Sequence, residues 1–237
     1  MGAYAGPKRK STNLKYCFDA ANSNCYTGSN NLKNAGGSGT GTMVNTTVGT
    51  DGVACFQFNG TNAYVSSDVD VSFDEATHFT LLVWAKTNVI SQGGGIVGKP
   101  NPGWEWGFRQ GSSNVGANAS GGTLFVQWNT GGGHSNIPIS YSATGFDNTT
   151  TWYHFAVVSD GSTIKMYKNG SLYDTRTYAD ASINQDRTNG VQLGGNIYAW
   201  GETWWNGKLG STNILQTPFT AVEIKEDFDN TKSRYGL

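Results

Sequence analysis

The glutamates are the residues of this chain that could cleave a glycosidic bond. That reaction needs two carboxylates about 5–10 Å apart, one of them with a raised pKa. The five glutamates are Glu75, Glu105, Glu202, Glu223 and Glu226. Glu105 is the one in a strand-like run, but its i±2 neighbours, Gly103 and Gly107, place no second carboxylate on its face. Spacing does not support a partner from another strand, such as Asp174 or Glu202, so we expect no enzyme.

A cluster of acidic residues could hold a calcium ion, and its members are Asp68, Asp70, Asp74 and Glu75. Calcium binds oxygen ligands, which carboxylates at alternate positions of a loop can supply. The segment lacks the glycine turn and the terminal glutamate of a dedicated calcium loop. We therefore interpret it as a solvated strand end and expect no cofactor, with Asp68 and Asp70 as the candidate ligands if calcium binds.

Histidine and serine show neither a zinc-binding nor a catalytic arrangement. His78, His134 and His154 are scattered, with no pair at metal-ligand spacing and no cysteine partner nearby. No Gly-x-Ser-x-Gly nucleophile elbow is present. His154 lies between Tyr153 and Phe155 in a strand-like run, and this position favours a hydrogen-bonded structural histidine.

The cysteines are Cys17, Cys25 and Cys55, which are too few for a disulfide framework in a domain of this size. Cys17 and Cys55 lie in strand-like runs, where a free cysteine usually behaves as a small buried hydrophobe. A bridge between Cys17 and Cys25 stays open as the alternative. The first residues contain no apolar export segment, so we expect synthesis in a reducing cytoplasm.

Aromatic residues give the remaining chemical signal, because exposed rings beside polar groups can bind the apolar faces and hydroxyl edges of sugars. The candidate carbohydrate-binding residues are Trp104, Glu105, Tyr198, Trp200 and Trp204. In a chain poor in aliphatic residues, tryptophans are also expected to form much of the core. Alternation along a strand places Trp104 and Trp106 together, facing inward, whereas Trp204 and Trp205 must face opposite ways.

The charge of the chain disfavours nucleic acid and membranes as partners. Charged residues make up 14% of the sequence and the net charge is -1, so no strong field would attract a polyanion. No stretch approaches the ~20 apolar residues needed to span a bilayer. The one basic run, Lys8-Arg9-Lys10, lies in a polar N-terminal arm, residues 1–13. It is interpreted as a solvated tether and as the candidate assembly contact of the arm.

Short apolar runs between Gly, Asn, Asp and Ser clusters predict an all-β chain. Strands are expected at residues 14–18, 53–58, 63–65, 79–86, 95–99, 104–109, 123–128, 152–159, 163–168, 171–177, 191–194 and 208–215. Asp160-Gly161 and Asn169-Gly170 predict tight hairpin turns, and Thr220 with Glu223 predicts a capping box for a short helix at 220–229. Residues 26–50 form a long polar stretch. Residues 14–237 should therefore form one antiparallel two-sheet β-sandwich with a short C-terminal helix.

Eight segments from residue 58 onward resemble, in order, the laminin-G-like branch of the concanavalin A-like lectin/glucanase superfamily. They are Phe58-Asn59-Gly60 with Tyr64-Val65, Phe79-Thr80-Leu81-Leu82-Val83-Trp84-Ala85, Gly95-Ile96-Val97-Gly98-Lys99, Trp152-Tyr153-His154-Phe155-Ala156-Val157-Val158, Met166-Tyr167-Lys168-Asn169-Gly170, Leu193-Gly194-Gly195, Trp205-Asn206-Gly207-Lys208-Leu209-Gly210 and Phe219-Thr220-Ala221-Val222-Glu223-Ile224. The resemblance implies a concanavalin A-like jelly roll used for binding or surface display. It implies no catalytic residue, because the acids of the glucanase branch have no counterpart here.

The opening segment, Tyr16-Cys17-Phe18-Asp19-Ala20-Ala21-Asn22, resembles the first strand and turn of family members encoded by tailed bacteriophages. That resemblance implies a non-enzymatic virion structural protein, such as a capsid decoration, fibre or tail-associated protein. Such a protein would fold in the host cytoplasm and dock on other virion proteins, here through the N-terminal arm. The alternative is a free lectin that binds host-surface glycan, and a glycoside hydrolase is the least favoured function.

Overall fold

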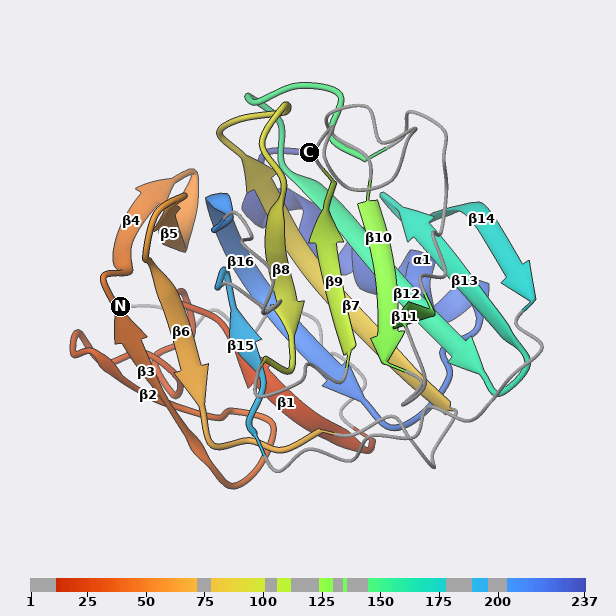
Figure 1. Ribbon diagram of the computed structural model, residues 1–237, viewed down its shortest axis with the longest axis horizontal. Helices are drawn as coiled ribbons and strands as arrows, with labels where there is room; N and C mark the ends of the chain where they lie inside the picture. Colours follow the sequence, from red (N-terminus) through yellow and green to blue (C-terminus); the bar gives the residue numbers. More distant parts are fainter. Residues whose placement is uncertain are drawn as a thin grey trace.

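The computed structural model describes residues 12–71, 78–100, 106–111, 124–129, 134–135, 145–177, 189–195 and 204–237. Within these ranges the chain forms two antiparallel β-sheets, one α-helix, α1 (Ala221–Thr231), and the 3-10 helix η1 (Lys232–Tyr235). Figure 1 shows the two sheets packed face to face, with α1 behind the more distant sheet. The predicted sandwich with a short C-terminal helix is confirmed. Lys8, Arg9 and Lys10 lie outside the described residues.

Sheet A is the sheet that α1 covers. Its described strands run in the order β14-β13-β12-β7-β16-β5-β4, and β1 also pairs with β16. They are β1 (Leu14–Phe18), β4 (Thr47–Asp51), β5 (Val53–Asn59), β7 (His78–Thr87), β12 (Tyr153–Asp160), β13 (Thr163–Lys168), β14 (Ser171–Thr177) and β16 (Asn206–Leu215). The first half of β16 pairs with β5 and its second half with β1, on either side of an irregularity between Leu209 and Thr212.

Sheet B faces the viewer in Figure 1, and its described strands run in the order β11-β10-β9-β8-β15-β6-β3-β2. They are β2 (Asn31–Lys33), β3 (Thr40–Val44), β6 (Tyr64–Ser67), β8 (Gly94–Gly98), β9 (Trp106–Gln110), β10 (Leu124–Asn129), β11 (His134–Ser135) and β15 (Gln192–Leu193). One row of directly paired residues forms its inner face, and every member is buried: Met43, Val65, Leu193, Val97, Phe108 and Val126.

The continuous apolar run of β7 is explained by burial on both faces of sheet A. Leu81 and Val83 point into the main core between the sheets, whereas Leu82 and Trp84 point to the opposite face. That outer face is covered by α1, whose Ile224 packs in the same cluster as Leu82. A strand buried on both faces loses the polar alternation that a half-exposed strand shows.

The predicted turns and helix cap are confirmed. Asn169 and Gly170 both have positive φ, at 51° and 78°, as a tight hairpin between β13 and β14 requires. At α1 the Thr220 side chain accepts a hydrogen bond from the Glu223 backbone N–H, and the Glu223 carboxylate accepts one from the Thr220 N–H. Among the described residues, no helix is long and apolar enough to cross a membrane.

Residues 26–50 differ from the sequence prediction, because this polar stretch contains β2, β3 and β4. In β3 the side chains alternate between exposed and buried, and Gly41 occupies a buried position. A Cβ atom at Gly41 would lie 2.9 Å from the Phe18 ring. This glycine is therefore required for close packing within a strand, whereas in the sequence it resembles a loop residue.

The three cysteines are buried and form no disulfide, so the alternative Cys17 to Cys25 bridge is not formed. The Cys25 Sγ accepts a hydrogen bond from the Asp19 backbone N–H at 3.4 Å. Burial raises the pKa of the Cys25 and Cys55 thiols to about 11. Because the thiolate is the reactive species, these side chains are inert core residues at neutral pH.

Candidate functional site

The structure describes one of the predicted carbohydrate-binding residues, Trp204; Trp104, Glu105, Tyr198 and Trp200 lie outside the described residues. Trp204 and Trp205 directly precede β16 and have opposite environments, as the sequence predicts. Trp205 is fully buried in the main core, whereas Trp204 is partly exposed. Because adjacent side chains of an extended chain point in opposite directions, the burial of Trp205 directs the Trp204 ring outward.

The Trp204 ring lies against Tyr64, the first residue of β6. Their ring centroids are 5.6 Å apart and the ring planes are tilted by 37°. Tyr64 is also partly exposed. We call these two rings the aromatic platform. The sequence assigns Tyr64 to a strand but gives no reason to pair it with Trp204, because 139 intervening residues separate the two.

Hydrogen bonds from the surrounding turns fix the backbone beneath the platform. The Gln92 Nε2 donates to the carbonyl oxygens of Gly60 and Trp204, at 3.3 and 3.4 Å. The Gly60 N–H donates to the Trp205 carbonyl at 3.1 Å. The Asn59 Oδ1 accepts from three successive backbone N–H groups that begin at Thr61. The Trp204 segment and the turn before Tyr64 are therefore held together as one rigid surface.

A polar row extends from the platform along the outer face of sheet B. Ser66 lies two residues after Tyr64 on β6 and therefore faces the same way. Thr42 of β3 and Gln192 of β15 pair directly with Ser66 from its two sides. Thr42 and Ser66 are exposed and Gln192 is partly exposed. Together they place two hydroxyl groups and the Gln192 side-chain amide next to the two aromatic rings, and the Oε1 atom of that amide is buried.

The side chains of the aromatic platform and of the adjoining polar row are better suited to binding a ligand than to catalysis. Their five side chains comprise two aromatic, two hydroxyl-bearing aliphatic and one amide side chain, and none of them is a carboxylate, a histidine or a lysine. Hydroxyl and amide groups can donate and accept hydrogen bonds to neutral ligands, and aromatic faces bind apolar surfaces. The described residues of this surface therefore offer the groups needed to bind an uncharged polar ligand that also has an apolar face, such as a sugar.

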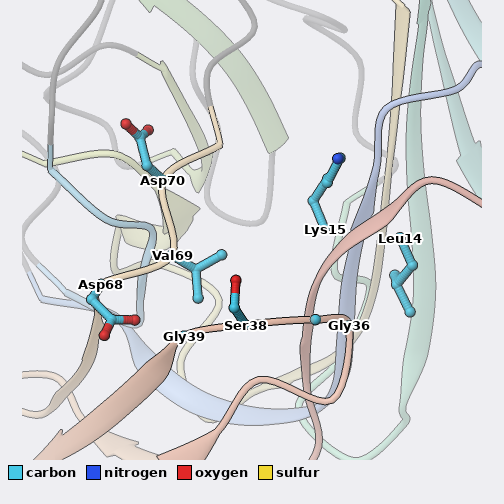
Figure 2. A pocket seen from close by; sticks show the side chains of 9 residues that line it. Leu14, Lys15, Gly36, Ser38, Gly39, Asp68, Val69 and Asp70 are labelled. Carbon is cyan, nitrogen blue, oxygen red and sulfur yellow. The ribbon is translucent and has the colours of Figure 1, made fainter.

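The candidate calcium ligands Asp68 and Asp70 line a separate cavity of about 470 Å³ between the end of β6 and the start of β1. Figure 2 shows both carboxylates on one side of this cavity and Lys15 on the other. Asp68 accepts from the Thr40 N–H at 2.6 Å and from the Thr40 hydroxyl at 2.9 Å. These hydrogen bonds hold the pKa of Asp68 below its ordinary value.

Asp70 accepts a hydrogen bond from the Nζ atom of the fully buried Lys99 at 2.6 Å. Both carboxylates thus make contacts that stabilise the fold. Asp74 and Glu75 lie outside the described residues, and among the described ones no three metal-binding side chains converge. Calcium binding at Asp68 and Asp70 stays a prediction.

His154 is a structural residue, as the sequence predicts. It is fully buried in β12, and its Nε2 atom lies 3.0 Å from the Asp227 carboxylate of α1. The imidazole ring also packs against Trp84, with ring centroids 5.1 Å apart. His154 therefore helps to attach the C-terminal helix to sheet A.

The two-sheet sandwich and its aromatic platform define a lectin-like β-sandwich domain. The chain belongs to the Laminin_G_3 family of the concanavalin A-like lectin/glucanases superfamily, whose model matches residues 59–225. This match confirms the laminin-G-like resemblance of the segments from residue 58 onward. No curated protein matches the chain.

Solved structures with the same fold include receptor-binding domains of botulinum neurotoxins. The type G receptor-binding domain has a TM-score of 0.64 at 13% identity, with 92% of this chain and 51% of that chain covered. A neurotoxin DC binding domain in complex with SialylT has a TM-score of 0.67 at 12% identity, and the match covers 92% of this chain and 52% of that chain. A botulinum neurotoxin type C structure, reported with an interaction with two ganglioside molecules, has a TM-score of 0.69 at 13% identity. The match covers 92% of this chain and 51% of that chain. This chain spans about half the length of these structures.

Proposed function

We propose that this chain is a non-enzymatic lectin-like domain that binds saccharide through the aromatic platform and the adjoining polar row. The observation that carries the proposal is the partly exposed Tyr64–Trp204 pair, whose centroids lie 5.6 Å apart. A pyranose ring can place its C–H face on these aromatic rings. Its hydroxyl groups would then meet Thr42, Ser66 and Gln192 along sheet B.

The fold comparisons support this proposal in a limited way. Two of the similar structures carry descriptions that refer to SialylT or to gangliosides, which shows that a sandwich of this kind occurs in glycan-binding proteins. Because about half of each structure lies outside the match, the binding residues of this chain are proposed from its own surface. A similarity at 12–13% sequence identity does not transfer the binding residues of those structures to this chain.

Replacing Trp204 with alanine should weaken saccharide binding by about tenfold or more, because one face of the proposed sugar site is lost. A glycan array would first identify a sugar that binds the wild-type domain. Titration calorimetry with that sugar would then compare wild type, Trp204→Ala and Trp204→Phe. The phenylalanine variant should keep most of the affinity, because it retains a ring.

Thermal unfolding of each variant provides the control for folding, since a partly exposed ring contributes little to the core. Absence of any binding at millimolar sugar, or equal affinity in wild type and Trp204→Ala, would exclude this site. Release of reducing sugar by the wild-type domain, lost in Glu105→Gln, would contradict the non-enzymatic part of the proposal.

A second proposal concerns where the domain acts. We propose that it is a bacteriophage virion component, a capsid decoration, fibre or tail-associated protein that is made in the host cytoplasm and docks through its N-terminal arm. The support is the phage-like opening segment, whose first part forms β1 and ends at Phe18. The two proposals are compatible, because a displayed domain can also contact a host-surface glycan.

Deleting residues 1–11 should leave a folded domain that no longer joins the particle. The deletion stops before Asn13, because the Asn13 carbonyl accepts a hydrogen bond from the Gln216 N–H at 3.0 Å and so belongs to the domain. Incorporation would be measured in purified particles after complementation with wild-type or truncated protein. Full incorporation of the truncated protein would refute docking through the arm.

A further inference from the structure

The outward-facing residues of β6 continue past the aromatic platform toward the cavity that Asp68 lines. Tyr64, Ser66 and Asp68 are at least partly exposed. Val65 and Val69, which alternate with them, are buried. Side chains at alternate positions of an extended chain point to the same side, so the three outward side chains form one column. Four residues of a β-strand span about 13 Å, which is roughly the length of three linked pyranose rings.

The neighbouring strand β3 adds two threonines beside this column. Thr42 pairs directly with Ser66. Thr40 donates its backbone N–H and its hydroxyl to the Asp68 carboxylate, at 2.6 and 2.9 Å. Both threonines are exposed. Thr40 therefore fixes the orientation of the Asp68 carboxylate, whose remaining lone pairs can accept further hydrogen bonds from a ligand.

The column ends at the cavity of about 470 Å³ shown in Figure 2. This volume lies within the range of roughly 300–1,000 Å³ that is usual for small-ligand sites. Besides Asp68, its polar lining includes Lys15, Ser38 and Asp70, all of them exposed residues. The cavity therefore offers an ammonium group and a hydroxyl group as donors, and two carboxylates as acceptors.

Positive and negative charges are mixed in this part of the described surface. The Asp70 carboxylate pairs with the Nζ atom of the buried Lys99 at 2.6 Å. Lys15 lies across the cavity from both carboxylates, and Lys33 is exposed on β2, the strand beside β3. An ion would meet a group of its own charge here. Hydroxyl groups can both donate and accept hydrogen bonds, so an uncharged ligand rich in hydroxyl groups fits this lining better.

We propose that the saccharide site extends from the aromatic platform to this cavity, so that it takes an uncharged oligosaccharide of about three units rather than a single sugar. This inference rests on the proposed function, because one end of the extended site is the Tyr64–Trp204 pair. The unit on the rings reaches Thr42 and Ser66 with its hydroxyl groups. The following units continue along the column to Asp68, which accepts hydrogen bonds from hydroxyl groups of the last one.

The test compares ligands of increasing length on the full chain. An array of cello-, malto- and chito-oligosaccharides would identify a neutral glycan that binds. Calorimetry with EDTA present, to keep calcium from the carboxylates, would then measure its mono-, di- and trisaccharide. The trisaccharide should bind at least about tenfold more tightly than the monosaccharide, because it gains hydrogen bonds at Asp68. A gain of threefold or less is explained by the number of sugar units alone and would overturn the proposal.

Asp68→Asn should weaken trisaccharide binding by about three- to tenfold, because a charged acceptor forms stronger hydrogen bonds than a neutral one. Monosaccharide binding should not change. The asparagine can still accept from the Thr40 N–H, and thermal unfolding would verify that the variant is folded. Glu226→Gln is the matched control, since it removes an exposed carboxylate from α1, which covers sheet A; it should change neither affinity. Equal weakening of both ligands by Asp68→Asn would indicate a structural role and contradict the proposal.

The outcomes separate this proposal from the proposed function. If the mono- and trisaccharide bind equally and Trp204→Ala weakens both, the platform binds sugar and the extension is wrong. If no sugar binds, or if Trp204→Ala has no effect, the proposed function fails and the extension fails with it. Tighter binding of trigalacturonate than of the neutral trisaccharide would overturn the assignment to an uncharged ligand.

Discussion

Replacing Trp205 with alanine should lower the free energy of unfolding by about 3–5 kcal/mol. The Trp205 side chain is fully buried and packs at ring-centroid distances of 5.7 Å from Phe58 and 6.5 Å from Phe146. Its Nε1–H donates to the buried Gln110 Oε1 at 3.1 Å. The alanine variant would lose these contacts and leave a cavity between the two sheets.

Urea denaturation of wild type, Trp205→Ala and Trp204→Ala would measure this effect on adjacent tryptophans. Trp204→Ala should cost about 1 kcal/mol or less, because its ring remains partly exposed to water. Trp205→Phe should recover part of the loss by filling some of the cavity. Similar losses for the two alanine variants would show that the core and surface assignments are wrong.

Replacing Trp84 with alanine should also cost about 3–5 kcal/mol, and it should weaken the attachment of the C-terminal helix in particular. The Trp84 ring stacks on Tyr235 with centroids 4.1 Å apart and on Phe228 with centroids 5.8 Å apart. Its Nε1–H donates to the Thr231 hydroxyl at 3.0 Å. These three contacts are made with α1 and η1, and the other side of the same packing is formed by His154 of β12.

Hydrogen exchange followed by mass spectrometry would locate the effect of Trp84→Ala. Amide protection in residues 221–235 should fall more than protection in the hairpin of β13 and β14. Trp84→Phe would keep a stacked ring and lose the hydrogen bond to Thr231, with a smaller expected cost of about 1–2 kcal/mol. Uniform loss of protection across the domain would argue against a local role for Trp84.

Local sequence signals predicted those parts of the fold that depend on neighbouring residues. The Asn169-Gly170 turn and the Thr220 cap each follow from a few adjacent side chains, and β13 and β14 have the predicted bounds. β3 and β4 were missed because each contains a glycine that is required by close packing against another strand. In β4, a Cβ at Gly49 would lie 2.2 Å from the Gln57 side chain.

The candidate site could be predicted only in part, because it is assembled by strand register. The sequence singles out Trp204 by its aromatic neighbours. Tyr64 joins it through the three-dimensional fold, and Thr42, Ser66 and Gln192 align through the pairing of β3, β6 and β15. These three side chains are ordinary polar strand residues in the sequence. To find them, one would have had to predict which residues of β3, β6 and β15 pair with one another in sheet B.

The position of β16 has a consequence for the order in which the domain can fold during synthesis. This strand lies between β7 and β5 in sheet A, and its second half pairs with β1, so that Phe18 lies opposite Thr212. Closing contacts of such long sequence separation is slow. Until β16 leaves the ribosome, β1, β5 and β7 lack this shared partner, and their unpaired edges can associate with other chains. Sheet A therefore cannot be completed before β16 has been synthesised, and we expect chaperones to protect the nascent chain until that point.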